Sequence, residues 1–424
     1  MSRHLSTSLP RVLAVLPAIM PSTTIGVAKP LKRLHRERRL RVILTLESLV
    51  SRRRVAGADL IVFCRNTEPA VNHALEWAKE LRKPIIYELD DDFFTIPVAV
   101  PGGVYHRRPE RLNQLRDYLA SASLIRVYSE TMRQKLLTIN PAVERVAGPL
   151  CWDLVPSRPV TRKDPGKVRI VYATSRVKDE LENIFLGDME QVLERFPQKV
   201  ELFLWGYYSS KFAKHPSVSF LKYVSDYDRF FRQFARSGFD IGLAPLHDDD
   251  FHRSKSNNKF REYAACRIAG VYSDVPVYSE CVQDGITGLL VKNRPGAWFD
   301  AIKQLVLDDG LRSLIQDKAQ QYARTHYNEE NSCNTWLEQI HRLLSPGFGL
   351  EGSKGIAMAT IHNTELGTAA WRGAERLVDG AATFFMGLLR AMVLVGNIRN
   401  NGLRTSFNAF RLAAKDWLLL RRIR

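Results

Sequence analysis

The fold class is decided by residues 239–278, which read FDIGLAPLHDDDFHRSKSNNKFREYAACRIAGVYSDVPVY. An apolar run of strand length, 239–246, leads into a polar loop, a segment with helical periodicity and a second apolar run at 269–274. Strand, helix and strand in this order form the βαβ unit of a parallel sheet. Both runs are nearly continuous rather than alternating, as expected for strands that are buried on both faces. The segment therefore predicts an α/β domain whose ligands bind beyond the carboxyl ends of its strands.

Apolar runs alternate with helical segments on both sides of this unit as well. A basic, Pro-containing stretch at 155–169 interrupts the alternation and is typical of a linker. We therefore predict two Rossmann-like, doubly wound domains at 1–155 and 166–345, followed by a helical appendage at 350–424. The predicted strands are 12–17, 40–46, 58–64, 84–89 and 123–128 in the first domain, and 168–174, 200–206, 218–224, 239–246, 269–274 and 287–291 in the second.

The net charge of +17 is concentrated at the two ends of the chain. Residues 1–60 hold 12 Lys/Arg and 3 Asp/Glu, and residues 386–424 hold 8 and 1. Proteins that track nucleic acid usually carry basic residues along the whole contact surface, so no nucleic-acid partner is expected. Nucleic-acid binding stays a weaker alternative, and it would depend steeply on salt. Two basic ends instead favour docking on an anionic surface such as a membrane.

The appendage at 350–424 carries aromatic and basic side chains on helical stripes, an arrangement typical of helices in membrane interfaces. Packing of these helices on the domains or on a second subunit is the alternative, and it stays open. The chain has no run of about 18 uncharged apolar residues, which is the length that a transmembrane helix needs. Its five cysteines are scattered and lack a CxxC pair, so a reducing compartment is expected. These features predict a cytoplasmic protein with peripheral contact to the cytoplasmic face of the membrane.

An anion site is predicted at the start of the helix within 239–278. Ser256 is the expected helix cap, Asn257 follows it, and Lys255, Lys259 and Glu262 share one side at i, i+4, i+7 spacing. Lysines at a helix N-terminus oppose the helix dipole, and an anionic ligand there would reverse this penalty. A diphosphate on the free amides and the two ammonium groups, with Glu262 accepting from ribose hydroxyls, fits these residue types. The alternative is a surface ion pair between Lys259 and Glu262.

In the first domain, Asp90, Asp91 and Asp92 come directly after the strand at 84–89. They are expected to face the cleft, where they would position an acceptor hydroxyl or, in the case of Asp91, stabilise positive charge at the reacting carbon. Helix capping or turn formation is the alternative. Consecutive side chains diverge along a strand, so no metal site is expected.

These segments resemble the nucleotide-sugar glycosyltransferases of GT-B fold, group 1 type. The donor segment of that family also joins a polar loop to a helix bearing an E-Y-A-A run. Its D-G-x-x-G-x-L-V pattern is found in residues 277–319, VYSECVQDGITGLLVKNRPGAWFDAIKQLVLDDGLRSLIQDKA. The resemblance implies two Rossmann-like domains, with the donor in the second and the acceptor in the first. It also implies retention of anomeric configuration and no obligatory metal or other cofactor.

The resemblance implies further site residues. Arg176 and Lys178, after the strand at 168–174, lie where the family contacts donor phosphates, and Ser22 and Thr23 lie in the loop that approaches the reacting sugar. Solvated loops are the alternative for both segments. The family commonly carries E-x7-E; Glu262 matches the second glutamate, but Ser254 occupies the first position.

The expected activity is transfer of a sugar from a nucleotide diphosphate sugar to a surface-polysaccharide, glycolipid or related acceptor. A non-catalytic GT-B module that binds glycan or scaffolds a synthesis complex is the main alternative, because the first glutamate is missing. A sugar-nucleotide epimerase of the same fold, which needs no acceptor, is a related one.

Overall fold

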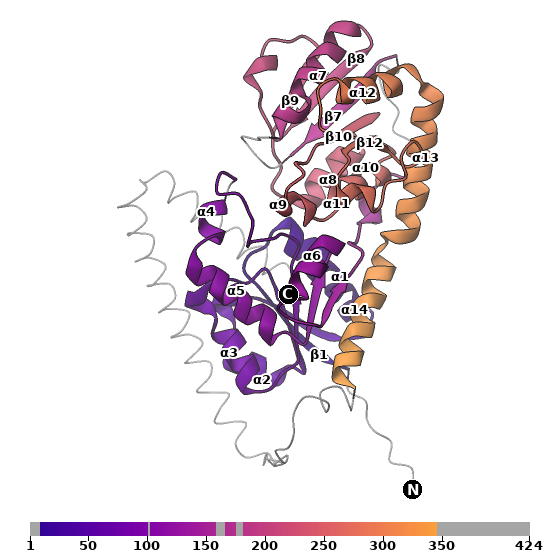
Figure 1. The fold of residues 1–424 in the computed structure, drawn as a ribbon. Helices are drawn as coiled ribbons and strands as arrows, with labels where there is room; N and C mark the ends of the chain where they lie inside the picture. Colours follow the sequence, from indigo (N-terminus) through magenta and orange to yellow (C-terminus); the bar gives the residue numbers. More distant parts are fainter. Residues whose placement is uncertain (1–8, 101, 158–165, 175–180, 346–424) are drawn as a thin grey trace, which may run out of the picture. The chain divides into compact units, whose positions relative to one another are not determined.

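The computed structural model describes residues 9–100, 102–157, 166–174 and 181–345. These residues contain two parallel six-stranded sheets with helices on both faces, which confirms the predicted pair of doubly wound α/β domains (Figure 1). The predicted appendage at 350–424 lies outside the described residues.

The first sheet has the order β2-β1-β3-β4-β5-β6, so the direction of winding reverses at β1. Residues of β1 alternate between two cores: Leu13 and Val15 pack on one face and Val12 and Ala14 on the other. Its strands are β1 (Arg11–Leu16), β2 (Arg41–Leu46), β3 (Leu60–Cys64), β4 (Ile85–Glu88), β5 (Leu124–Val127) and β6 (Val143–Arg145). The helices around it are α1 (Lys29–Arg36), α2 (Arg52–Gly57), α3 (His73–Glu80), α4 (Gly103–His106), α5 (Pro109–Ser121) and α6 (Glu130–Leu136).

The second sheet has the order β12-β11-β10-β7-β8-β9, with the reversal of winding between β7 and β10. Val171 of β7 packs on one face, and Ile170 packs on the other. Its strands are β7 (Val168–Ala173), β8 (Val200–Trp205), β9 (Val218–Leu221), β10 (Ile241–Ala244), β11 (Ala269–Ser273) and β12 (Leu289–Val291). The helices that follow are α7 (Glu182–Arg195), α8 (Tyr227–Ala235), α9 (Asp250–Arg253), α10 (Asn258–Ala265), α11 (Pro276–Ser279), α12 (Ala297–Leu307) and α13 (Asp309–His326).

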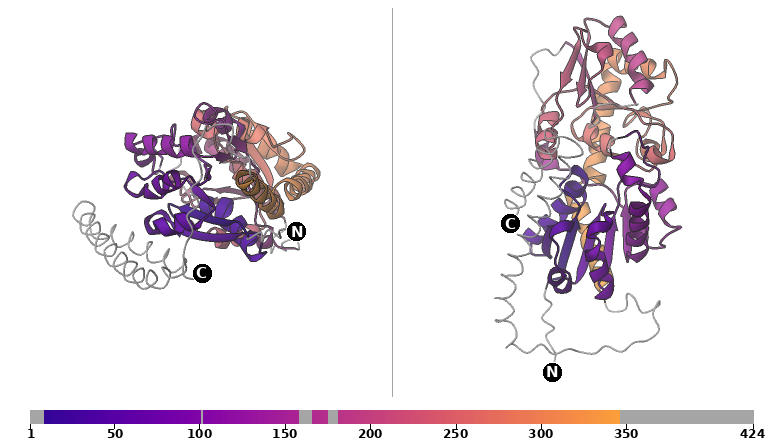
Figure 2. Two further views of the ribbon diagram at one scale, coloured as in Figure 1. Left: turned by 90° about the horizontal axis from the view of Figure 1, so that it is seen from below. Right: turned by 90° about the vertical axis from the view of Figure 1, so that its left-hand side faces the viewer.

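The last described helix, α14 (Glu329–Leu344), follows the second domain in the chain but packs on the first. Its buried Cys333, Trp336 and Ile340 share a core with Val12 and Ala14 of β1. Figure 1 shows α13 beside the second sheet and α14 beside the first, and the side view in Figure 2 shows the same path. The predicted domain at 166–345 therefore ends with a helix that completes the core of the first domain.

Part of the N-terminal basic cluster is neutralised by α14. Arg33 pairs with Glu330 and with Glu37, and Arg39 donates to Asn334 at 3.1 Å. These arginines hold α14 in place, so they contribute less to an exposed basic surface than their number in the sequence indicates. None of the described helices has the length and hydrophobicity that crossing a bilayer requires.

Candidate active site

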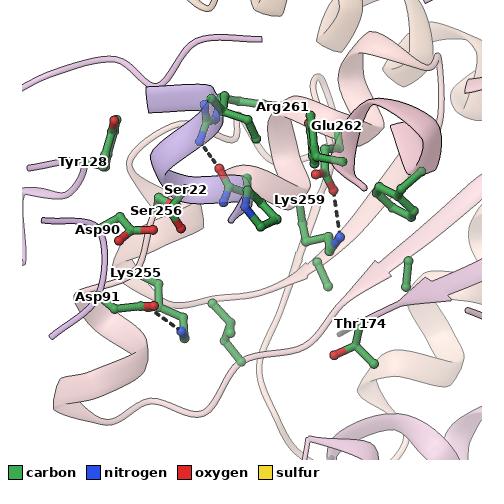
Figure 3. Close-up of a pocket in the computed structure, with 18 of the residues that line it drawn as sticks. Ser22, Asp90, Asp91, Tyr128, Thr174, Lys255, Ser256, Lys259, Arg261 and Glu262 are labelled. Atoms are coloured by element: carbon green, nitrogen blue, oxygen red, sulfur yellow. Dashed lines mark hydrogen bonds and ion pairs between the residues drawn. The ribbon is translucent and has the colours of Figure 1, made fainter. Parts of the chain in front are cut away.

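A cavity of about 330 Å³ lies between the carboxyl ends of the strands of the two sheets. This is where ligands bind in open parallel α/β sheets, because loops diverge where the winding reverses. The first domain supplies the loop after β1 (Pro21 and Ser22) and the loop after β4 (Asp90 and Asp91). The second domain supplies the ends of β7 and β10, the turn before α10 (Lys255 and Ser256), and one side of α10 (Asn258, Lys259, Arg261 and Glu262) (Figure 3).

Helix α10 begins one residue later than the sequence analysis predicted. Asn258 is its first residue and Asn257 precedes it, so Ser256 lines the cavity but does not cap the helix. The Asn257 side chain makes no capping hydrogen bond either; its amide donates to the Tyr327 hydroxyl at 2.9 Å, and Asn257 does not line the cavity. The first amides of a helix have no intrahelical acceptor. Those of α10 begin at the cavity wall, so the dipole favours an anion there.

Lys259 and Glu262 form an ion pair inside the cavity. Lys259 Nζ lies 2.7 Å from Glu262 Oε2, as Figure 3 shows, and Glu262 is only 6% exposed. The alternative of a pair on a solvated helix face is therefore wrong. A buried carboxylate beside an ammonium group presents one acceptor and one positive charge to a ligand with hydroxyl and phosphate groups.

Lys255 crosses from the second domain to the acids of the first. Its Nζ lies 2.8 Å from Asp91 Oδ1, and Arg65 Nη1 lies 3.0 Å from Asp91 Oδ2. Burial alone would raise the pKa of Asp91, but Lys255 and Arg65 outweigh it and lower that pKa well below its usual range. Asp91 is therefore ionised at neutral pH and is bound on both oxygens.

Arg65 was not among the predicted site residues. It follows β3 directly, has a left-handed backbone (φ 62°), and pairs with both Asp90 and Asp91. Its position just beyond a strand was visible in the sequence, but its acidic partners come from the next strand along the sheet. Only the pairing of β3 with β4 brings these groups together.

Tyr128, at the end of β5, is a second lining residue that the sequence analysis missed. Its hydroxyl donates to Glu88 Oε1 at 2.5 Å, and the other oxygen of Glu88 accepts from Arg126 at 2.9 Å. Burial raises the pKa of Glu88, although Arg126 and the Tyr128 hydroxyl oppose that shift. Arg126 in turn lies over the Trp336 ring of α14 at 3.7 Å. This buried chain of contacts fixes one wall of the cavity to α14.

The predicted loop after β1 contributes Ser22 but not Thr23. Ser22 lines the cavity, whereas Thr23 is fully buried and donates to the carbonyls of Ala18 at 2.9 Å and Met20 at 3.1 Å. Thr23 therefore stabilises the turn, and its predicted place on the acceptor side is corrected. Gly26, in the same turn, lines the cavity and leaves no room for a side chain.

Asp92 is also corrected. It does not line the cavity: its side chain is fully buried, accepts from the Phe94 amide at 2.9 Å and pairs with Lys135. This is the turn-forming alternative, in which an aspartate accepts from the backbone two residues ahead. Arg176 and Lys178, the predicted phosphate contacts, lie outside the described residues.

Ser254 occupies the first position of the family's E-x7-E pattern, and its side chain is turned inward. Its Oγ donates to the Asp250 carbonyl at 2.8 Å, and its own carbonyl accepts from Ser129 Oγ of the first domain at 3.0 Å. Ser254 therefore joins the domains and does not line the cavity. The next residue in the chain, Lys255, does line the cavity, so a positive charge lies close to where the family commonly has a glutamate.

The end of the cavity near β8 is aromatic. Trp205, Tyr227 and Phe230 line it, with the Trp205 and Phe230 rings edge to face at a centroid distance of 5.3 Å. Flat apolar walls of this kind accept planar rings. The cavity thus combines an aromatic end, a helix N-terminus with cationic side chains, and an acidic loop.

Among the described residues, Cys151, Asp153 and Glu329 form one group whose ligand atoms lie within 4.8 Å of one another. The group is unsuited to a metal ion, because Lys29 Nζ lies 3.1 Å from Cys151 Sγ. Burial also raises the pKa of Cys151 to about 12, so its thiol stays protonated. None of the three residues lines the cavity.

Comparison with known proteins finds a family match within the second domain. Residues 169–308 match the family model for glycosyl transferases group 1. No curated protein matches the chain in sequence.

Solved structures with the same fold share little sequence with the chain. HepE of Anabaena, crystallised with UDP and glucose, is 13% identical with a TM-score of 0.57, over 78% of this chain and 100% of that chain. A glycosyltransferase of Rickettsia africae is 14% identical with a TM-score of 0.55, over 79% and 99%. Sucrose-phosphate synthase of Thermosynechococcus elongatus is 13% identical with a TM-score of 0.57, over 79% and 99%. The chain thus has the GT-B fold, and its residues 169–308 match the family model for glycosyl transferases group 1.

Proposed function

We propose that the chain transfers a sugar from a nucleoside diphosphate sugar to a glycan or glycolipid acceptor, as in surface-polysaccharide assembly. One observation carries the proposal: the N-terminal end of α10, with Lys255, Lys259 and Glu262, faces Asp91 of the other domain across one cavity. HepE, which has the same fold, was crystallised with UDP-glucose, so a uridine diphosphate sugar is the first donor to test.

The donor would lie along the second domain. Its base would pack against the aromatic end near Trp205, its ribose hydroxyls would donate to Glu262, and its diphosphate would accept from the α10 amides, Lys255 and Lys259. We assign Arg176 and Lys178 to the opposite side of the diphosphate, from the family resemblance alone. Ser256 would supply a hydroxyl and backbone close to the phosphates.

Transfer breaks the bond between the anomeric carbon and the diphosphate, which leaves with the electron pair. Lysine ammonium groups and helix amides already aimed at the leaving oxygens would stabilise this charge in the transition state. The acceptor oxygen bonds to the anomeric carbon and loses its proton to a phosphate oxygen. The low pKa of Asp91 makes it a poor base, so we assign to it the stabilisation of positive charge at the anomeric carbon, and to Asp90 and Ser22 the positioning of the acceptor. Retention of configuration without a metal is part of this proposal.

The test is a panel of nucleotide sugars incubated with the purified chain, with and without candidate acceptors, in buffer containing a chelator. Release of nucleoside diphosphate from one donor is expected, and Lys255→Ala should lower the rate at least tenfold. Asp249→Ala, in a residue that does not line the cavity, should leave the rate unchanged. If no donor is bound or cleaved, a non-catalytic glycan-binding or scaffold role replaces the transferase. The inward-turned Ser254 is the observation that favours that second candidate.

Conversion of the donor into an epimeric nucleotide sugar without acceptor, with no net release of nucleoside diphosphate, would point instead to an epimerase. We further propose that the chain acts in the cytoplasm and contacts the anionic membrane surface through its basic ends, with no nucleic-acid partner. The distribution of charge between residues 1–60 and 386–424 supports this. An electrophoretic shift titrated with salt tests the nucleic-acid alternative.

A further inference from the structure

The first domain carries an exposed apolar surface close to the acceptor side of the cavity. Val98, Val104 and Tyr105, here called the α4 patch, are 61%, 65% and 42% exposed. Among the described residues, the two valines are the most exposed of all large apolar side chains. Single exposed apolar residues are ordinary, but exposed apolar groups that lie together mark a contact surface.

The members of the α4 patch do lie together, because a glycine lets two backbone segments touch. Gly103 donates from its amide to the Val100 carbonyl at 2.8 Å. A Cβ added at Gly103 would lie 2.0 Å from the Pro97 carbonyl oxygen and 2.9 Å from the Val98 Cα. Only glycine permits this approach, which sets the Val98 backbone beside Gly103, the residue before Val104.

The α4 patch is anchored to the cavity. His106, at the end of α4, stacks on Phe93 with ring centroids 4.1 Å apart and an interplanar angle of 2°. Arg65, which binds Asp90 and Asp91 of the cavity, lies over the same Phe93 ring at 4.8 Å. A ligand held at the α4 patch is therefore in fixed register with the acidic loop. Figure 1 shows α4 at the margin of the first domain.

Basic side chains adjoin the apolar ones. Arg107 and Arg108 follow α4 directly and are exposed, and the Arg108 guanidinium lies 5.8 Å from the Tyr105 ring. Valine and tyrosine beside arginine match the boundary between lipid headgroups and acyl chains, where apolar groups enter the bilayer and cations contact anionic lipids. The chain's own C-terminal segment fits less well, since residues 386–424 hold 8 basic residues and 1 acidic residue and would repel these arginines.

We propose that the α4 patch inserts into the headgroup region of an anionic lipid bilayer and turns the acceptor side of the cavity toward that surface. This docking differs from the membrane contact proposed for the basic ends. It uses another part of the chain, and it adds an apolar contact to the attraction between charges. Its relation to the acceptor rests on the proposed function, whereas the docking itself does not.

A probe placed in the α4 patch tests this directly in the full chain. Val104→Cys labelled with an environment-sensitive fluorophore is mixed with vesicles of phosphatidylcholine with or without 30% phosphatidylglycerol. The emission should shift to shorter wavelength and rise at least twofold with the anionic vesicles only. The same label at Leu314→Cys, 46% exposed on α13, should not respond. Labelled wild-type protein controls for its own cysteines, of which four are buried and Cys266 is half-buried.

A second pair of variants measures the contribution to binding. Val98→Asp combined with Val104→Asp should lower vesicle affinity in flotation by about tenfold, because two apolar groups are lost and two anions gained. Ile286→Asp combined with Leu314→Asp is the matched control and should float like wild type. An unresponsive Val104→Cys label, or equal flotation of both double variants, would overturn the proposal. So would a label already shifted without lipid, since another part of the chain or a second copy would then cover the patch. Sugar-transfer activity, measured separately, reports only on the proposed function.

Discussion

Replacing Asp91 by asparagine is expected to tighten the binding of a nucleoside diphosphate while it slows sugar transfer. Lys255 is held by Asp91, with Nζ 2.8 Å from Oδ1. A donor phosphate must share this ammonium group with the carboxylate. Asparagine keeps the shape of the side chain and removes the charge, so Lys255 becomes available to the phosphate. The same change removes the negative charge that we propose stabilises the positive anomeric carbon in the transition state, so transfer should slow.

The size of the effect follows from the distances. A phosphate oxygen accepting from Lys255 would lie about 2.8 Å from Nζ, which puts the two anions about 6 Å apart. Two unit charges at that separation repel by about 3 kcal/mol at an effective dielectric constant of about 20. Arg65 stays within 3.0 Å of residue 91 and offsets part of this repulsion. We therefore expect Asp91→Asn to relieve about half of this repulsion. That is about 1.4 kcal/mol of binding free energy, or a tenfold lower Kd.

The assay is isothermal titration of uridine, guanosine and adenosine diphosphates into wild type, Asp91→Asn and Lys255→Ala. Lys255→Ala should weaken binding of the same nucleotide that Asp91→Asn tightens. Asp248→Asn is the matched control, because Asp248 is exposed, pairs with Arg253 and does not line the cavity. An unchanged or weaker affinity of a folded Asp91→Asn variant would refute the idea that Asp91 competes with the donor for Lys255.

Three further variants test the site and its support. Glu262→Ala should lower the transfer rate at least tenfold, and Asp249→Ala should not, as steady-state assays with the identified donor will show. Gly26→Ala should destabilise the protein by about 2 kcal/mol in urea unfolding, because its Cβ would lie 2.2 Å from a buried carboxylate oxygen; Gly57→Ala, with nothing within 4 Å, should not. Burial raises the pKa of Glu47 from 4.5 to about 7 against an opposing hydrogen bond, so the folded state binds that proton more tightly than the unfolded state. Stability should then fall as pH rises from 4.5 to 7, and Glu47→Gln should gain up to about 3 kcal/mol at pH 8 but nothing at pH 4. A gain independent of pH would contradict this.

The strands could be predicted because buried parallel strands are continuous apolar runs. The exception is β6, whose three residues Val-Glu-Arg carry no such run. The placement of α14 on the first domain was not predictable from the sequence, because its apolar stripe could pack on either domain. Only the contacts of Trp336 and Ile340 in the core of the first domain show which one it covers. The start of α10 was misplaced because a serine is a frequent cap, yet here Asn257 precedes the helix.

Of the candidate site, the residues on one helix were placed well and those in turns were not. Lys259 and Glu262 line the cavity because helical spacing follows from the sequence, whereas Lys255 reaches the cavity from the turn before α10 and not from the helix on which it was predicted. Asp91 and Asp92 are adjacent and chemically alike, but the turn after β4 directs one to the cavity and buries the other. Partners from different strands, such as Arg65, depend on the pairing order of the sheet.

The central claim is that a nucleoside diphosphate sits on the N-terminal end of α10. A crystal structure of the chain with its preferred nucleoside diphosphate measures this most directly. We predict β-phosphate oxygens within about 3.2 Å of the first α10 amides and of Lys255 or Lys259 Nζ, with the ribose hydroxyls on Glu262. A nucleotide bound away from α10, or both ammonium groups directed out of the cavity, would contradict it.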